Sequence, residues 1–221
     1  MTDFYTAAKE RENQIIRDTR QQLENYQIEV KHQDGVYRHL ECYDPKKGWE
    51  DSFQVYTAPG TVTIRGYWCS AYTLKSTCIL KSTCDMLTNF LNDDEPNIDY
   101  WAEEVENRTR LETTEYEFVK LCLFDYLDYW EEDDMDTAML DSCKYDLEQW
   151  IDIDDPLLID NLSNWKFSYR DAETGRLMKV QPFYSFTFED ASWDVWTEEW
   201  IRVCELLRWT ACKVTGMEST K

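Results

Sequence analysis

Carboxylates are the residues of this chain that are numerous enough, and close enough in sequence, to suggest chemistry. The 221 residues include 45 Asp and Glu against 23 Lys and Arg, a net charge of −22. Between Asp93 and Asp160 there are 24 carboxylates and four basic residues, so this segment alone carries −20. With so many carboxylates, a pair at glycosidase-like separation is expected by chance and identifies no active site. The concentrated charge instead predicts repulsion from nucleic acid and attraction to basic surfaces, including surfaces that hold nucleic acid.

The two histidines, His32 and His39, are the next candidates for chemistry. They fall on opposite arms of a predicted hairpin, where they could face one another. Together with Asp34 or Glu41 they could bind a metal or move protons. Two ordinary surface histidines are the alternative, because the sequence shows no further ligand.

Other catalytic signatures are missing from the sequence. None of the eight cysteines is spaced as CxxC, which argues against structural zinc, and six glycines leave little material for a phosphate-binding loop. The cysteines with basic neighbours, Cys78 and Cys84, are interpreted as structural. We therefore expect a protein that is not an enzyme, with no metal and no cofactor.

The elements that position these residues can be read from hydrophobic periodicity. Residues 26 to 32 alternate up to Asp34-Gly35, a hairpin turn signal, and residues 37 to 42 return; a second strand pair is separated by Pro59-Gly60. About four antiparallel strands are expected. Helical spacing returns after Thr83, a candidate cap for a helix from Asp85 to Leu91.

The expected architecture is a single α+β domain, an antiparallel sheet with helices packed on it and an acidic helical middle segment. Its parts are an N-terminal helix (1–24), antiparallel strands (26–70), the acidic helical segment (85–163) and a hairpin plus C-terminal helix (165–221). In the acidic segment Asn97 should cap a helix through Trp101 to Glu106, and further helices should span Glu112 to Trp130 and Asp134 to Trp150. The last helix should run from Glu198 to Thr215 and stop at Gly216. Rings such as Trp101, Phe118 and Trp150 predict that the acidic segment is folded.

The N-terminus reads Met1-Thr2-Asp3-Phe4 and continues into charged sequence without an apolar signal core. No apolar run approaches the roughly 20 residues that span a bilayer. We expect a cytoplasmic protein with reduced cysteines and no membrane partner.

Several sequence motifs of the chain resemble those of a family of uncharacterised accessory proteins of tailed phages and prophages. The first motifs are Tyr37-Arg38-His39-Leu40 and residues 57–66, which contain Pro-Gly. They are followed by Asp85-Met86 with Phe90, by Asn97-Ile98-Asp99-Tyr100-Trp101-Ala102-Glu103, and by residues 208–216, which contain Trp and Cys. They occur in the family's order across residues 37 to 216, although Tyr67 stands where the family usually has Asp. The resemblance implies a phage-encoded protein in the cytoplasm of a bacterial host, and it implies no reaction.

Charge and resemblance together favour a phage-encoded, non-catalytic inhibitor of a host defence or nucleic-acid-processing complex. Two adjacent helices with a carboxylate on each turn would approach the charge density of nucleic acid. The partner would be a basic host protein or nucleoprotein complex, such as a defence effector or a DNA- or RNA-binding protein, with no direct binding to nucleic acid. The alternative use of the charge is solubility alone. The candidate partner-binding residues are Asp125, Asp128, Glu131, Glu132, Asp133, Asp134, Asp136, Asp146, Glu148, Asp152, Asp154 and Asp155.

A second hypothesis is a protein–protein adaptor or assembly factor that binds through aromatic residues near the C-terminus. Most of these rings are interpreted as core, but any exposed ones would anchor a partner. High salt should release a partner held by charge and not one held by aromatic rings. The residues are Phe183, Tyr184, Phe186, Phe188, Trp193, Trp196, Trp200 and Trp209.

Overall fold

A computed structural model of the chain describes residues 4–76, 84–91, 93–106, 111–129, 137–153, 158–170, 175–183 and 194–218. The chain divides into two compact units. The sheet unit comprises Arg11–Leu111 and Trp196–Lys221, and the helical unit comprises Met1–Glu10 and Glu112–Val195. That the two form a single domain stays a prediction.

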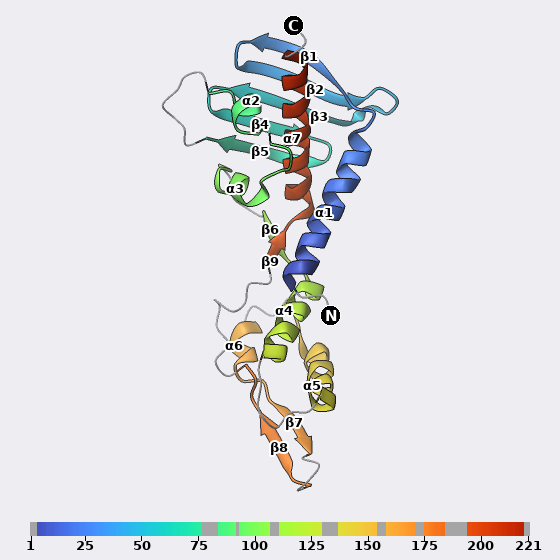
Figure 1. Ribbon diagram of the computed structural model, residues 1–221, viewed down its shortest axis with the longest axis vertical. Helices are drawn as coiled ribbons and strands as arrows, with labels where there is room; N and C mark the ends of the chain where they lie inside the picture. Colours follow the sequence, from blue (N-terminus) through green and yellow to red (C-terminus); the bar gives the residue numbers. More distant parts are fainter. Residues whose placement is uncertain are drawn as a thin grey trace. The chain divides into compact units, whose positions relative to one another are not determined.

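The fold is α+β, as the sequence predicts, and within the described residues five strands form one antiparallel sheet in chain order (Figure 1). The strands are β1 (Gln27–Asp34), β2 (Tyr37–Asp44), β3 (Gly48–Ala58), β4 (Thr61–Gly66) and β5 (Cys69–Lys75). Gly35 and Gly60 have positive φ at the β1–β2 and β3–β4 turns, which confirms both predicted hairpins. The sequence pattern did not predict β5 as a strand of this sheet.

Strand alternation places one face of the sheet against helices. In β2 every second residue is buried, and Leu40 and Cys42 are at most 1% exposed. Helix α7 (Glu198–Glu218) runs across this face in Figure 1. The Trp209 ring on α7 lies 6.4 Å from Tyr26 and 6.2 Å from Phe53, measured between ring centroids.

Short helices complete the sheet unit. Helix α2 (Met86–Asn89) is capped by Asp85, whose carboxylate accepts a hydrogen bond from the Leu87 N–H and pairs with the buried Arg38 at 2.7 Å. Helix α3 (Ile98–Glu103) is capped by Asn97, as predicted, but it ends three residues before the predicted end at Glu106. Thr83, the predicted cap of α2, lies outside the described residues.

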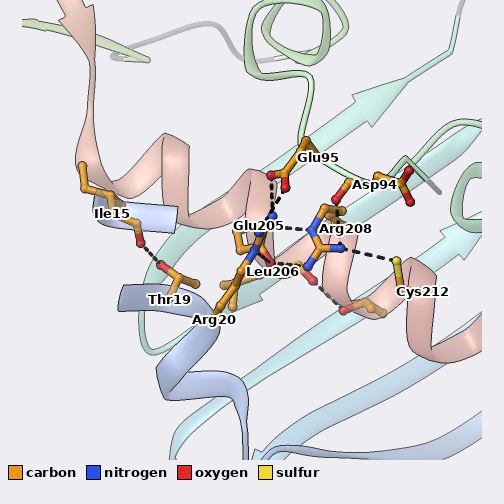
Figure 2. Close-up of polar contacts among 10 residues, drawn as sticks. Ile15, Thr19, Arg20, Asp94, Glu95, Glu205, Leu206, Arg208 and Cys212 are labelled. Atoms are coloured by element: carbon orange, nitrogen blue, oxygen red, sulfur yellow. Dashed lines mark hydrogen bonds and ion pairs between the residues drawn. The ribbon is translucent and has the colours of Figure 1, made fainter. Parts of the chain in front are cut away.

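Helix α1 (Phe4–Leu23) confirms the predicted N-terminal helix, and its later turns are tied to α7 by ion pairs (Figure 2). Glu205 on α7 is fully buried, and its carboxylate accepts from Arg20 Nε at 3.1 Å and from Arg208 Nε at 2.8 Å. Arg20 also pairs with Glu95, and chiefly this hydrogen bond raises the pKa of the Arg20 guanidinium above its ordinary value. Burying a carboxylate is tolerated here because two guanidinium groups compensate it.

The helical unit is built around α4 (Tyr116–Tyr129) and α5 (Thr137–Trp150). Val119, Leu123, Cys143 and Leu147 are buried in its core. The remaining elements are β6 (Glu112–Thr114), α6 (Leu158–Leu162), β7 (Phe167–Arg170), β8 (Leu177–Val180) and β9 (Asp194–Trp196); β6 pairs with β9, and β7 with β8.

Several predicted boundaries were wrong. The helix expected from Glu112 begins at Tyr116, because Glu112–Thr114 pairs as a strand with β9 instead. Helix α7 continues through Gly216 to Glu218, since a glycine in a helix costs stability but does not end it.

Candidate functional site

The acidic charge is concentrated in the helical unit. Its sequence contains 24 carboxylates and seven Lys and Arg, a net charge of −17, whereas the sheet unit carries −5. Roughly three quarters of the net charge therefore belongs to one compact unit. A field from this unit extends about 8 Å into solution at physiological ionic strength.

The lysines of α4 and α5 add little positive charge to the outer surface. Lys144 is buried, with 8% of its side chain exposed, and its Nζ lies 2.5 Å from the Asp128 carboxylate. Lys120 pairs with Glu117 at 2.7 Å and Glu148 at 3.3 Å, and chiefly the Glu117 hydrogen bond raises its pKa. Both cations are neutralised within the helix pair. Solvent and partners therefore meet mainly carboxylates on these helices.

Three of the predicted partner-binding carboxylates already have contacts inside the unit. Asp125 is half-buried and accepts a hydrogen bond from the Phe4 N–H at 2.8 Å, at the first turn of α1. Asp128 and Glu148 are the partners of Lys144 and Lys120. These residues support the structure, and their charge is partly compensated.

Of the predicted carboxylates, Asp128, Asp146 and Asp152 are exposed at the surface. Asp141 on α5 and Glu117 on α4 are exposed as well. Along the axis of α5, Asp141 and Asp146 are about 7.5 Å apart. The remaining predicted residues lie outside the described residues: Glu131, Glu132, Asp133, Asp134, Asp136, Asp154 and Asp155.

The histidines are placed opposite one another, as the hairpin pattern predicts: His32 and His39 are partners in the β1–β2 register. The His39 ring stacks on Tyr56, with centroids 4.4 Å apart and planes inclined by 18°. Across the described parts of the chain, no group of three or more His, Cys, Asp or Glu is arranged to hold a metal ion. The geometry assigns His39 to packing on the sheet.

The cysteines of the core are poor nucleophiles. Burial raises the pKa of Cys42, Cys69 and Cys143 to about 12, and it raises the pKa of Cys204 as well. These thiols are protonated at neutral pH. Cys84 is a free, half-buried thiol, and Cys78 lies outside the described residues.

The C-terminal aromatics that can be placed belong to the core. Phe183 and Trp200 are fully buried and Trp209 is 9% exposed. Trp196 is half-buried, and its indole N–H donates to Asp99 at 2.8 Å. Tyr184, Phe186, Phe188 and Trp193 lie outside the described residues. The placed rings therefore give the adaptor hypothesis no exposed anchor.

Comparisons with known proteins identify no relative of this chain. No family model, curated protein or solved structure matches the chain. Within the helices that the structure describes, none combines the length and apolar character needed to cross a membrane.

Two hollows were not predicted from the sequence. One, of about 350 Å³, lies in the helical unit, where the Trp150 and Trp165 rings are 6.4 Å apart beside Asp152, Asn161 and Asn164. The other, of about 480 Å³, lies where β3 begins and β4 ends, and it is flanked by Trp49 and Tyr67. Single aromatic residues in turns leave no periodic signal, so only the folded sheet brings this second set together.

Proposed function

We propose that the chain is a non-catalytic, phage-encoded inhibitor whose acidic helical unit binds a basic host protein or nucleoprotein complex in place of nucleic acid. The phage origin and the bacterial target follow from the resemblance of the sequence. The binding mode follows from charge.

The pairing of Lys120 and Lys144 carries the proposal. An acidic protein that needs charge only for solubility can mix both signs over its surface. Here the cations of α4 and α5 are consumed in ion pairs within the helix pair, one of them almost completely buried. The outward charge on these helices is therefore dominated by one sign, the arrangement that attracts a cationic groove.

Folding against this self-repulsion costs stability, because like charges are held closer in the folded chain than in the unfolded one. A binding use would compensate for that cost. The same repulsion disfavours direct binding of nucleic acid, since neutralising phosphates needs basic residues.

The test is capture of partners from a bacterial lysate on the tagged full-length protein, followed by elution with a salt gradient. A nucleic-acid-binding complex that is released between about 0.15 M and 1 M salt, where the Debye length shrinks from about 8 to 3 Å, supports the proposal. Added DNA or RNA should also displace it. A partner that stays bound at high salt and is indifferent to nucleic acid contradicts it.

A charge-matched pair of variants makes the test specific to the helical unit. Asp141→Lys with Asp146→Lys reverses two exposed carboxylates of α5 and should weaken capture. Glu24→Lys with Asp34→Lys changes net charge equally, at exposed positions of the sheet unit, and should leave capture unchanged. Equal losses in both variants would show that net charge alone matters.

A further inference from the structure

The hollow in the sheet unit combines features that the acidic surface does not explain. It is open and measures about 480 Å³, within the range of small-molecule sites. Trp49 and Tyr67 flank it and are 78% and 74% exposed. Such large aromatic surfaces left in water at one hollow are the usual platforms for stacking a planar ligand.

Arg65 is held in place within the lining of this hollow. Its Nε and Nη2 donate to the Gln54 side-chain oxygen at 3.2 and 3.1 Å, and Nη2 also donates to the Tyr56 hydroxyl at 2.8 Å. Its guanidinium lies over the Tyr56 ring, 5.0 Å from the centroid. The pairing of Gln54 with Arg65 across β3 and β4 fixes this geometry. A guanidinium so constrained loses little conformational entropy when it binds an anion.

No carboxylate among the described residues pairs with Arg65, in a chain that has about twice as many carboxylates as basic residues. By contrast, Arg20, Arg38, Arg202 and Arg208 each form an ion pair. In an acidic protein an ordered arginine without a carboxylate is a site where an anion can bind without first displacing one.

Three carboxylates beside lining residues have partners of their own. Glu41, next to Gln54 in the β2–β3 register, pairs with Lys31 at 2.9 Å. Asp51 on β3 pairs with Lys47 at 3.1 Å. Glu199 accepts from the Ser70 N–H, beside the lining residue Cys69. The two lysines therefore reduce the repulsion that Glu41 and Asp51 would exert on an anion at Arg65.

Cys69 does not make the hollow a catalytic site. Burial raises the pKa of its thiol to about 12, so no thiolate is available at neutral pH. The hollow offers aromatic faces, a fixed guanidinium and the amide of Gln54, which are groups for binding.

We propose that this hollow binds a mononucleotide, with its base stacked on Trp49 or Tyr67 and its phosphate on Arg65. An aromatic ring and an anion in one small molecule use both features of the site. The net charge of −22 selects the single nucleotide over a polymer, because each further phosphate adds repulsion. The site lies in the sheet unit and does not depend on the inhibitor proposal.

Titration calorimetry of the full-length protein with AMP, GMP, CMP and UMP tests the assignment, with adenosine, inorganic phosphate and a dodecameric single-stranded DNA as comparison probes. At least one mononucleotide should bind more tightly than adenosine, phosphate or the DNA. The absence of mononucleotide binding at millimolar concentration overturns the proposal. Tighter binding of phosphate or of DNA than of every mononucleotide also overturns it.

Variants then locate the site. Arg65→Gln should weaken binding roughly tenfold or more, and Arg65→Lys should restore only part of it because the ammonium lacks the planar fork. Tyr67→Ala or Trp49→Ala should weaken it by roughly fivefold to a hundredfold, the usual effect of losing one stacking platform.

Exposed residues that do not line the hollow provide the controls: Tyr5→Ala and Arg17→Gln should bind like the parent protein. Circular dichroism and the thermal midpoint verify that each variant is folded. Unchanged affinity in folded Arg65→Gln, or in both aromatic variants, contradicts the assignment.

Discussion

The buried thiols illustrate how environment sets chemistry at the residue scale. Cys42, Cys69 and Cys143 have pKa values raised to about 12 by burial, which removes charge that the core cannot solvate. The sequence predicts reduced cysteines that are neither zinc ligands nor nucleophiles, and burial makes these three thiols small apolar side chains. The fold adds which of the described cysteines are buried.

These pKa shifts predict that the free energy of unfolding falls as pH rises above about 9. Between that pH and about 12 the unfolded thiols lose their protons while the folded ones keep them, so the unfolded state is favoured. Below about pH 8 these thiols contribute no pH dependence. The raised pKa values of Tyr26, Tyr72 and Lys120 act in the same direction at high pH.

Urea unfolding at pH 8 and pH 10 measures this effect. Equal free energies of unfolding at the two values would contradict it.

Replacing glycine by alanine should have opposite effects on stability at Gly66 and at Gly216. At Gly66 an added Cβ would lie 2.6 Å from the Cα and Cβ of Phe53, so Gly66→Ala should cost about 1–3 kcal/mol. At Gly216, inside α7, nothing lies within 4 Å, so Gly216→Ala should stabilise by about 0.5–1 kcal/mol. Thermal unfolding of both variants checks the pair, and a stabilised Gly66→Ala would show that β4 can shift away from β3.

At the scale of elements, the buried Glu205 joins α1 to α7 (Figure 2). Glu205→Ala would leave Arg20 and Arg208 without their shared carboxylate, and the expected loss of stability is about 3 kcal/mol, because Arg20 is partly solvated.

Glu95 provides the matched control. It also pairs with Arg20, but its side chain is 68% exposed, so Glu95→Ala should cost less than about 1 kcal/mol. Chemical denaturation measures both. A loss at Glu95 as large as the loss at Glu205 would show that burial does not set the strength of this network.

Local signals account for the elements that were predicted correctly. Asp34-Gly35 and Pro59-Gly60 mark hairpin turns, and Asn97 caps α3 as expected. The strand Glu112–Thr114 was missed because its partner is β9, about eighty residues later, and no local pattern encodes such pairing. Strand β5 was missed because its polar residues Ser70, Thr73 and Lys75 give only weak alternation.

At the scale of the whole molecule, the sequence predicts where charge accumulates but not which charges remain available. Asp125 lies in the acidic segment, yet it bonds the Phe4 N–H, 121 residues away. Lys144 reads as a surface lysine on an acidic helix, yet it is buried against Asp128 and lies 5.6 Å from the Phe124 ring. The charge count of the sequence therefore locates the acidic segment. The fold then distinguishes the carboxylates with structural contacts from those that are exposed.

The central claim is that the acidic helical unit binds a basic partner. The most direct measurement is retention of the captured host complex by a full-length variant in which Glu131, Glu132, Asp133 and Asp134 are all changed to Lys. The matched control reverses Glu24, Asp34, Asp93 and Asp94, exposed carboxylates of the sheet unit. At about 0.15 M salt we expect the first variant to lose its partner and the second to keep it. Full retention by a folded first variant would contradict the claim.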